Sequence, residues 1–99
     1  MTIKFEKNDK ELTAFVEGRL DTLTSPELEE KLEPVLDDIE KLVFDFSELE
    51  YISSAGLRVL LAAVKEMDAR GGEMSVKNLR SEVMEVFEVT GFADILTIL

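Results

Sequence analysis

Two adjacent serines, Ser53 and Ser54, carry the hydroxyl groups of this sequence that are best placed for chemistry. They stand just before Ala55-Gly56 and an apolar stretch with helical spacing, so we expect them at the start of a helix. A helix N-terminus leaves backbone N–H groups unpaired and carries the positive end of the helix dipole, which favours a hydroxyl or an added phosphate. One interpretation makes a serine only an N-cap, and the other makes Ser54 a modified residue.

Nucleophilic catalysis by Ser54 has little support in the sequence. A catalytic serine needs an adjacent base, but the chain has no histidine, no lysine at a catalytic spacing and no G-x-S-x-G elbow. The pair Gly71-Gly72 is not followed by the Lys-Ser or Lys-Thr of a phosphate loop. Without cysteine and histidine the usual zinc ligands are missing as well. We therefore expect a protein without enzymatic activity, metal or cofactor.

Asp21, Asp45 and Thr24 are the other polar residues that we single out. If their segments end on the same edge of the sheet as Ser54, the two carboxylates form a conceivable metal pair. The simpler interpretation is structural or one of partner contact, because Asp45 ends a strand and can accept a bond from a turn amide, while Asp21 precedes a helix start. Thr24 is first of all a helix cap.

The stretch from Leu42 to Val64 must position these residues. It begins with a short continuous apolar run through Phe46, which is typical of a strand buried on both faces of a parallel sheet. From Leu57 the apolar residues recur at helical spacing and predict an amphipathic helix that Arg70-Gly71-Gly72 ends. The predicted buried stripe is Leu57, Leu60, Leu61, Val64 and Met67.

The other side of this helix has two interpretations. Arg58, Ala62, Lys65 and Ala69 share one side that rises from the serines. The simpler interpretation is a solvated surface. The alternative is a docking strip, in which the flanking residues Val59 and Ala63 give apolar area to a protein partner.

The residues before the central stretch predict a hairpin and a helix. Residues 2–7 and 11–17 alternate as strands should, with a turn at 8–9, and Gly18 is expected to end the hairpin. Thr24 as N-cap, Pro26 in the first turn and Glu27 as capping-box partner predict a helix that begins at residue 24 or 25. Pro34 removes the backbone bond to Glu30, so we expect a kink or a short second turn there.

The residues after the central stretch predict a strand over 73–77 and a helix over 82–89, capped by Ser81 and stopped by Gly91. The end, 92–99, reads either as a short helix running into a last strand or as a last helix. This order of elements predicts an α/β fold, a small mixed β-sheet with helices packed on it. Its length makes residues 1–99 one domain with a single core, and we expect a monomer.

The composition limits the kinds of partner that the protein is expected to bind. A net charge of −11 repels nucleic acid phosphates and favours a basic protein partner, although it also serves simply to keep the protein soluble. No run of eighteen apolar residues occurs and the N-terminus lacks the apolar segment of a signal peptide. We therefore expect a cytoplasmic protein that binds neither nucleic acid nor membrane.

Several motifs in the same order resemble those of STAS domains, specifically the bacterial anti-sigma factor antagonists. Each motif is weak alone, but together they span nearly the whole chain. They are Gly18-Arg19-Leu20-Asp21-Thr22-Leu23-Thr24, Asp45-Phe46-Ser47, Tyr51-Ile52-Ser53-Ser54-Ala55-Gly56-Leu57, Gly71-Gly72-Glu73-Met74 and Val89-Thr90-Gly91-Phe92.

The resemblance implies the STAS fold and a switch. Ser54 occupies the family's phosphoacceptor position, where phosphorylation by an anti-sigma factor serine kinase would end binding to that partner and a phosphatase would restore it. Many relatives have Asp before the phosphoacceptor, whereas this chain has Ser53, a second but lesser candidate. The resemblance also implies a set of partner-binding residues in the two motifs around Asp21 and Ser54. They are Asp21, Thr24, Ser53, Ala55, Gly56 and Arg58.

Two alternatives remain beside this switch. One is a STAS scaffold subunit of a larger signalling or transport assembly, in which Ser54 is not modified. The other, which rests on the helix N-terminus alone, is a small-molecule or nucleotide site at the Ser54 turn.

Overall fold

Strands and helices alternate after an N-terminal hairpin in the computed structural model, which describes all of residues 1–99. The strands are β1 (Thr2–Asn8), β2 (Glu11–Leu20), β3 (Lys41–Asp45), β4 (Leu49–Ile52), β5 (Glu73–Lys77) and β6 (Thr97–Ile98). The helices are α1 (Ser25–Leu32), α2 (Ser54–Ala69) and α3 (Ser81–Thr90), with short 3₁₀ helices η1 (Glu33–Val35) and η2 (Phe92–Asp94).

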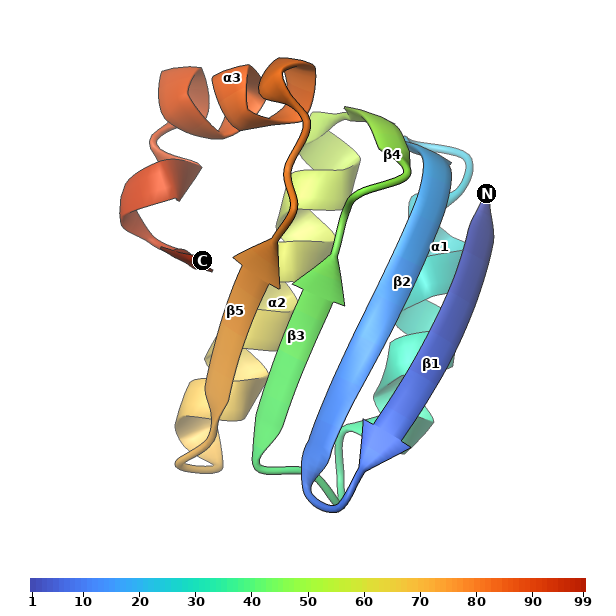
Figure 1. Cartoon of the computed structure of the whole chain (residues 1–99), viewed down its shortest axis with the longest axis vertical. Coiled ribbons are helices and arrows are strands. Elements are labelled where there is room, and N and C mark those ends of the chain that lie inside the picture. The colour runs from blue at the N-terminus through green and yellow to red at the C-terminus, as the bar shows by residue number, and fades with distance from the viewer.

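The sheet is mixed, as predicted. Its strand order is β1-β2-β3-β5-β6, with β4 paired separately to the end of β2. Only β1 runs antiparallel to its neighbour, and all other pairs are parallel. Figure 1 shows α1 and α2 behind the sheet and α3 beyond the end of β5, so that the remaining face of the sheet carries no helix. The predicted α/β fold is therefore confirmed.

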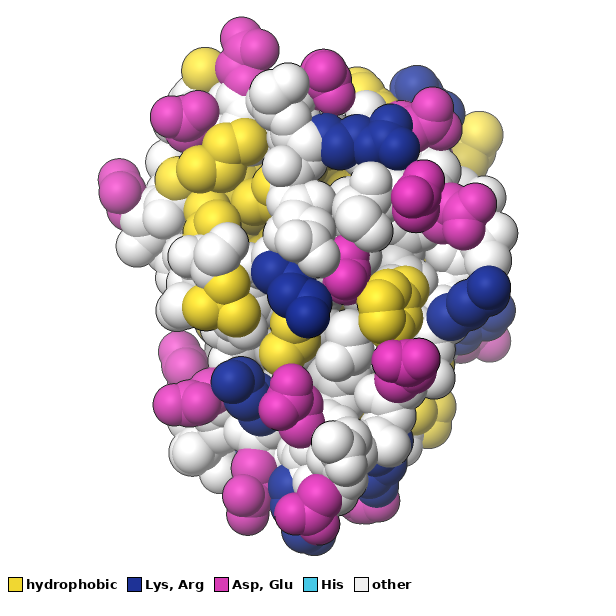
Figure 2. All heavy atoms as spheres, viewed as in Figure 1, with side chains coloured by type: hydrophobic (Ala, Val, Ile, Leu, Met, Phe, Trp, Pro, Cys, Tyr) yellow, Lys and Arg dark blue, Asp and Glu magenta, His cyan; other side chains and the backbone are white.

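The core lies between the sheet and the two helices behind it. The predicted alternation of β2 is confirmed, because Leu12, Ala14 and Val16 are buried while Thr13 and Phe15 are partly exposed. Phe44 and Phe46 fill the centre with ring centroids 5.5 Å apart. On the uncovered face, Lys and Arg side chains are interspersed with Asp and Glu side chains (Figure 2), so the net charge does not gather there as one acidic field.

Strand β2 continues where the hairpin was expected to end. Gly18 does not close the strand: it adopts a φ of +97°, which glycine tolerates, and its N–H donates to Glu48 O over 2.9 Å. At this point β2 changes partner from β3 to β4, with a shift of register between Gly18 and Arg19. The sequence reading missed β4 altogether, because a strand of only four residues offers too short a pattern.

The helix start at Ser25 agrees with the prediction, but its capping does not. Thr24 occupies the N-cap position without a capping bond from its side chain, so the capping box with Glu27 was wrong. The Thr24 hydroxyl is instead bonded to the preceding loop, donating to Arg19 O over 2.8 Å. The expected break at Pro34 is confirmed, since α1 gives way there to η1.

The C-terminal third follows the prediction with one correction. Helix α3 begins at Ser81, and Arg80 rather than Ser81 holds the N-cap position; the Ser81 hydroxyl bonds only the Glu82 carboxylate. Helix α3 ends at Gly91 as predicted. Of the two readings for 92–99, the short helix running into a last strand is the one observed. None of the helices is both long and apolar enough to cross a lipid bilayer.

Helix α2 lies close against the sheet at Gly56. A methyl group added there would lie 2.8 Å from Ile52 Cγ1 and 2.9 Å from both Leu20 Cγ and the Leu20 carbonyl oxygen. These distances are shorter than carbon–carbon contacts allow. Since one of the neighbours is backbone, glycine is the residue that lets the first turn of α2 rest on the ends of β2 and β4.

Gly56→Ala is expected to lower the free energy of unfolding by about 1–2 kcal/mol, and Gly56→Val by more, because the new side chain forces the helix off the strands. Urea unfolding measures both. Ala62→Ser, on the exposed side of the same helix, is the control and should change the value by less than about 0.5 kcal/mol. Stabilisation by alanine at position 56 would show that helix propensity outweighs the contact.

Candidate functional site

The start of α2 is fixed to the end of β2 by backbone bonds. Ser53 is the N-cap residue, with an extended backbone (φ −101°, ψ 177°), and Ser54 is the first helical residue. The Ser53 N–H donates to Leu20 O over 2.9 Å, and Ser53 O accepts the N–H of Leu57 over 3.0 Å. The serines therefore stand at the edge of the sheet where β2 and β4 end.

The two hydroxyls have different surroundings. Ser54 is exposed, whereas Ser53 Oγ is buried and has no bonding partner. The interpretation of a serine as N-cap is confirmed in position by Ser53, but its side chain makes no capping bond. An external group can reach the Ser54 hydroxyl directly, but it can reach the Ser53 hydroxyl only after the turn opens.

The loop between β2 and α1 lies beside this helix start and is strongly ordered. Asp21 Oδ1 accepts the N–H groups of Leu23 (3.0 Å) and Thr24 (3.2 Å), and Thr24 Oγ1 accepts the Asp21 N–H over 2.9 Å. The bond from the Thr24 N–H, with that from Leu23 and the charge of Arg19, holds the pKa of Asp21 below its ordinary value despite some desolvation. Asp21 and Thr24 thus fix the shape of the loop that borders the serines.

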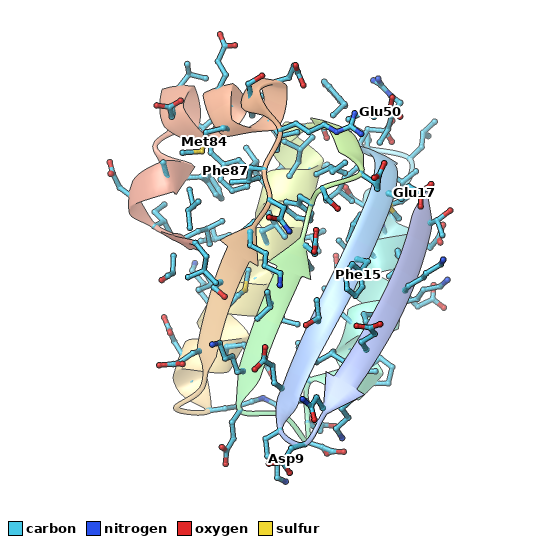
Figure 3. The ribbon with its side chains drawn as sticks, viewed as in Figure 1. Asp9, Phe15, Glu17, Glu50, Met84 and Phe87 are labelled. Atoms are coloured by element: carbon cyan, nitrogen blue, oxygen red, sulfur yellow. The ribbon has the colours of Figure 1, made fainter.

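Strand β4 adds an aromatic residue that sequence reasoning did not assign to the site. The guanidinium of Arg19 lies over the Tyr51 ring, 4.2 Å from its centroid, and Arg19 Nε is 3.7 Å from Asp21 Oδ2. Figure 3 shows Glu17 and Glu50 at this end of the sheet and Asp9 at the opposite end. Both Arg19 and Tyr51 belong to the motifs described above, but only the pairing of β4 with β2 reveals that they meet.

The remaining predicted contact residues divide between surface and interior. Arg58 is exposed one turn after Ser54, and Ala55 is partly exposed. Gly56 is buried against β2 and β4, so it supports the site and does not offer a direct contact. The docking strip is corrected in the same way. Val59 and Ala63, which were expected to offer apolar area to a partner, are only 5% and 4% exposed and line the groove between α2 and α1.

Both carboxylate oxygens of Asp45 accept hydrogen bonds from residues that follow β3 and β5. Its Oδ1 accepts the Ser47 N–H over 3.0 Å and its Oδ2 accepts the Asn78 side-chain amide over 3.1 Å. The expected bond to a turn amide is thereby confirmed. Because Asp21 and Asp45 each bond their own turn, a shared metal site between them has no support in the geometry.

The arrangement around Ser54 is suited to recognition by another protein. An exposed hydroxyl stands at a helix N-terminus, flanked by an ordered loop and by a cation stacked on an aromatic ring. The chain has no histidine that could serve as the general base for this hydroxyl. A chemical group added to Ser54 would change the charge of this surface without entering the core.

Comparison with known proteins agrees with this reading. The STAS domain family model matches residues 2–99. A protein of Bordetella bronchiseptica that is named as anti-sigma factor antagonist BtrV is 36% identical over 99 residues, which is 99% of this chain and 85% of that protein.

Solved structures share the fold over nearly the whole chain. An anti-sigma factor antagonist from Mycobacterium paratuberculosis superposes with a TM-score of 0.87 at 26% identity, covering 98% of this chain and 83% of that one. The Bacillus cell fate determinant SpoIIAA in its phosphorylated form gives a TM-score of 0.77 at 17% identity, covering 99% and 91%. The second likeness concerns the fold alone.

Asp45→Ala is expected to lower the free energy of unfolding by about 2 kcal/mol at neutral pH, because it removes a buried, ionised acceptor from the amides of Ser47 and Asn78. Burial raises the pKa of Asp45, but the bonds from Ser47 and Asn78 and the Lys77 charge outweigh burial and hold it below its ordinary value. The contribution is therefore complete above about pH 4, the unfolded pKa, and is lost as the pH falls through the folded pKa.

Urea unfolding from neutral to strongly acidic pH measures this difference. The exposed Asp68→Ala is the control and should show no such pH-dependent gap. A gap between parent and Asp45→Ala that widened toward acid would contradict the assigned direction of the pKa shift.

Proposed function

The chain belongs to the STAS domain family, and we propose that it works as an anti-sigma factor antagonist whose binding is switched by phosphorylation of Ser54. Its partner is an anti-sigma factor of the serine kinase class. In the unmodified state the chain docks on this kinase and frees the sigma factor. The kinase ends the interaction by phosphorylating Ser54, and a phosphatase restores it.

One observation carries the proposal: of the two serines at the start of α2, Ser54 has the exposed hydroxyl, and this hydroxyl makes no bond within the protein. The Ser53 hydroxyl is buried, and Thr24 Oγ1 is engaged with Arg19 O and the Asp21 N–H. The resemblance of the Tyr51–Leu57 motif to that of the anti-sigma factor antagonists also supports Ser54 as the phosphoacceptor. A kinase can therefore modify Ser54 without unfolding the turn.

The fold accommodates a phosphate at this position. Phosphorylation adds about −1.5 to −2 charges and three acceptor oxygens. At the first residue of α2 the added oxygens meet unpaired N–H groups and the positive end of the helix dipole. The modified protein should therefore keep its structure, and any loss of binding must arise at the interface.

The interface with the kinase, by contrast, is expected to exclude a phosphate on Ser54. A dianion enclosed by a docked partner loses its hydration, and unless the partner supplies a cation this costs several kcal/mol. A tenfold loss of affinity needs only about 1.4 kcal/mol. A modification that is harmless to folding is thus sufficient to release the partner.

The chain is a substrate and ligand of the kinase, and is not itself a catalyst. It acts as a monomer, binds protein and not nucleic acid, and works in the cytoplasm, where sigma factors meet RNA polymerase. The net charge of −11 agrees with a protein partner that presents basic groups.

Ser54→Asp is expected to keep its circular dichroism spectrum and melting temperature nearly unchanged and to bind the kinase at least tenfold more weakly, since an acidic side chain near a helix start stabilises the helix by a few tenths to about 1 kcal/mol. Ser54→Ala should still dock but resist phosphorylation. Calorimetric titration of both variants against the purified kinase, with mass spectrometry after incubation with ATP, measures these outcomes.

Ser53→Ala is the matched control and should be phosphorylated like the parent. Parent-like affinity of Ser54→Asp, or phosphate found on Ser53 or Thr24, would place the switch on another residue. A parent protein that binds no anti-sigma factor would overturn the function itself.

Asp21→Ala is expected to weaken kinase binding or phosphorylation more than it lowers the melting temperature, because its bonds shape a surface loop and reach no core residue. Thermal melting and titration must be compared on the same preparation. Asp38→Ala, which removes the exposed pair with Lys7 outside the site, should alter neither greatly. A large fall in melting temperature with unchanged affinity would make Asp21 purely structural.

A further inference from the structure

Leu23 is the most exposed of the large apolar side chains. It is 89% exposed and lies in the loop between β2 and α1. Tyr51, at 39%, is the other large apolar side chain exposed near the serines, whereas Val89, Ile95 and Leu99 belong to α3 and the C-terminal segment. A single exposed leucine needs no explanation in itself, so its position and rigidity decide whether it matters.

The position of Leu23 is tied to the serine turn. Its loop leaves β2 directly after Leu20, whose carbonyl oxygen accepts the N–H of Ser53 over 2.9 Å. Leu20 also pairs with Ile52 at the end of β4. A protein that docks over Ser54 therefore meets this loop at the same time.

The backbone of Leu23 is fixed before any partner arrives. Its N–H donates to Asp21 Oδ1 over 3.0 Å, and the next residue, Thr24, is held from both sides through Arg19 O and the Asp21 N–H. The Ser25 N–H donates to Asp21 O over 2.8 Å and closes the loop. An apolar side chain on so ordered a loop loses little entropy on binding, which is the condition for an efficient anchor.

Tyr51 lies at the same end of the sheet, paired with Arg19 where β4 runs beside β2. Its ring is stacked under the Arg19 guanidinium at 4.2 Å, and Arg19 in turn approaches Asp21, which shapes the Leu23 loop. Tyrosine and arginine are, with tryptophan, the residue types enriched among those that dominate binding energy at protein interfaces. The leucine and the ring thus belong to one preorganised surface next to the exposed hydroxyl.

We propose that Leu23, together with Tyr51 at the same end of the sheet, is the apolar anchor by which this chain docks on its anti-sigma factor. The inference rests on the proposed function and adds what that partner must present: an apolar pocket next to the group that reads Ser54. Leu23 supplies affinity that does not depend on the modification, and Ser54 supplies the switch.

Leu23→Ala should weaken binding to the purified anti-sigma factor kinase by about 10- to 100-fold, the effect of removing a side chain that the pocket would bury. Its melting temperature should equal that of the parent, since the side chain touches little of the fold. Leu23→Met, which keeps apolar volume, should restore binding to within about threefold. Val89→Ala removes another exposed apolar side chain, on α3, and should bind like the parent.

The outcomes separate this inference from the function on which it rests. If Ser54→Asp weakens binding but Leu23→Ala binds like the parent, the anchor is wrong and the function stands. Equal losses in Leu23→Ala and Val89→Ala, or failure of Leu23→Met to restore affinity, also overturn the anchor. If the parent itself does not bind the kinase, the proposed function and the anchor both fall.

Discussion

The close contact between the first turn of α2 and the ends of β2 and β4 is the constraint on which the site depends. Gly56 leaves no room for a side chain between the helix and the Leu20 carbonyl. The bond from the Ser53 N–H to that same carbonyl fixes the height at which the helix begins. Because the two contacts act on one backbone group, the helix start, the strand ends and the following loop form one rigid unit.

This constraint separates the two serines into different roles. At the N-cap position the Ser53 hydroxyl points into the protein, whereas the hydroxyl of the next residue, Ser54, is exposed to solvent. Charge added at Ser54 therefore meets the helix dipole and water but no core residue. A protein built in this way can change its surface charge while its stability, which comes from the core behind the sheet, stays nearly constant.

The loop beside the serines is ordered by polar bonds and not by burial of apolar side chains. Asp21 and Thr24 use their side chains to satisfy loop amides and carbonyls, which keeps Leu23 outside the core. Their side chains thus shape the surface around the site, while Asp45 does the same for a neighbouring turn on the other side of β3. Asp21, Thr24 and Asp45, the polar residues of these motifs, thus act mainly by stabilising turns through hydrogen bonds.

The sequence by itself determined the α/β class, the main strands and helices, the break at Pro34 and the place of Ser54 at a helix start, because these follow from side-chain periodicity and from local backbone preferences. Only the tertiary structure decided which partners those elements have. Four features join segments whose pairing leaves no periodic pattern in the sequence. They are the change of β2 from β3 to β4 at Gly18, the bonds of Thr24 to its own loop, the burial of Val59 and Ala63 between α2 and α1, and the stacking of Arg19 on Tyr51. Local patterns record which face of an element is buried, but what lies against that face is set by residues distant in sequence.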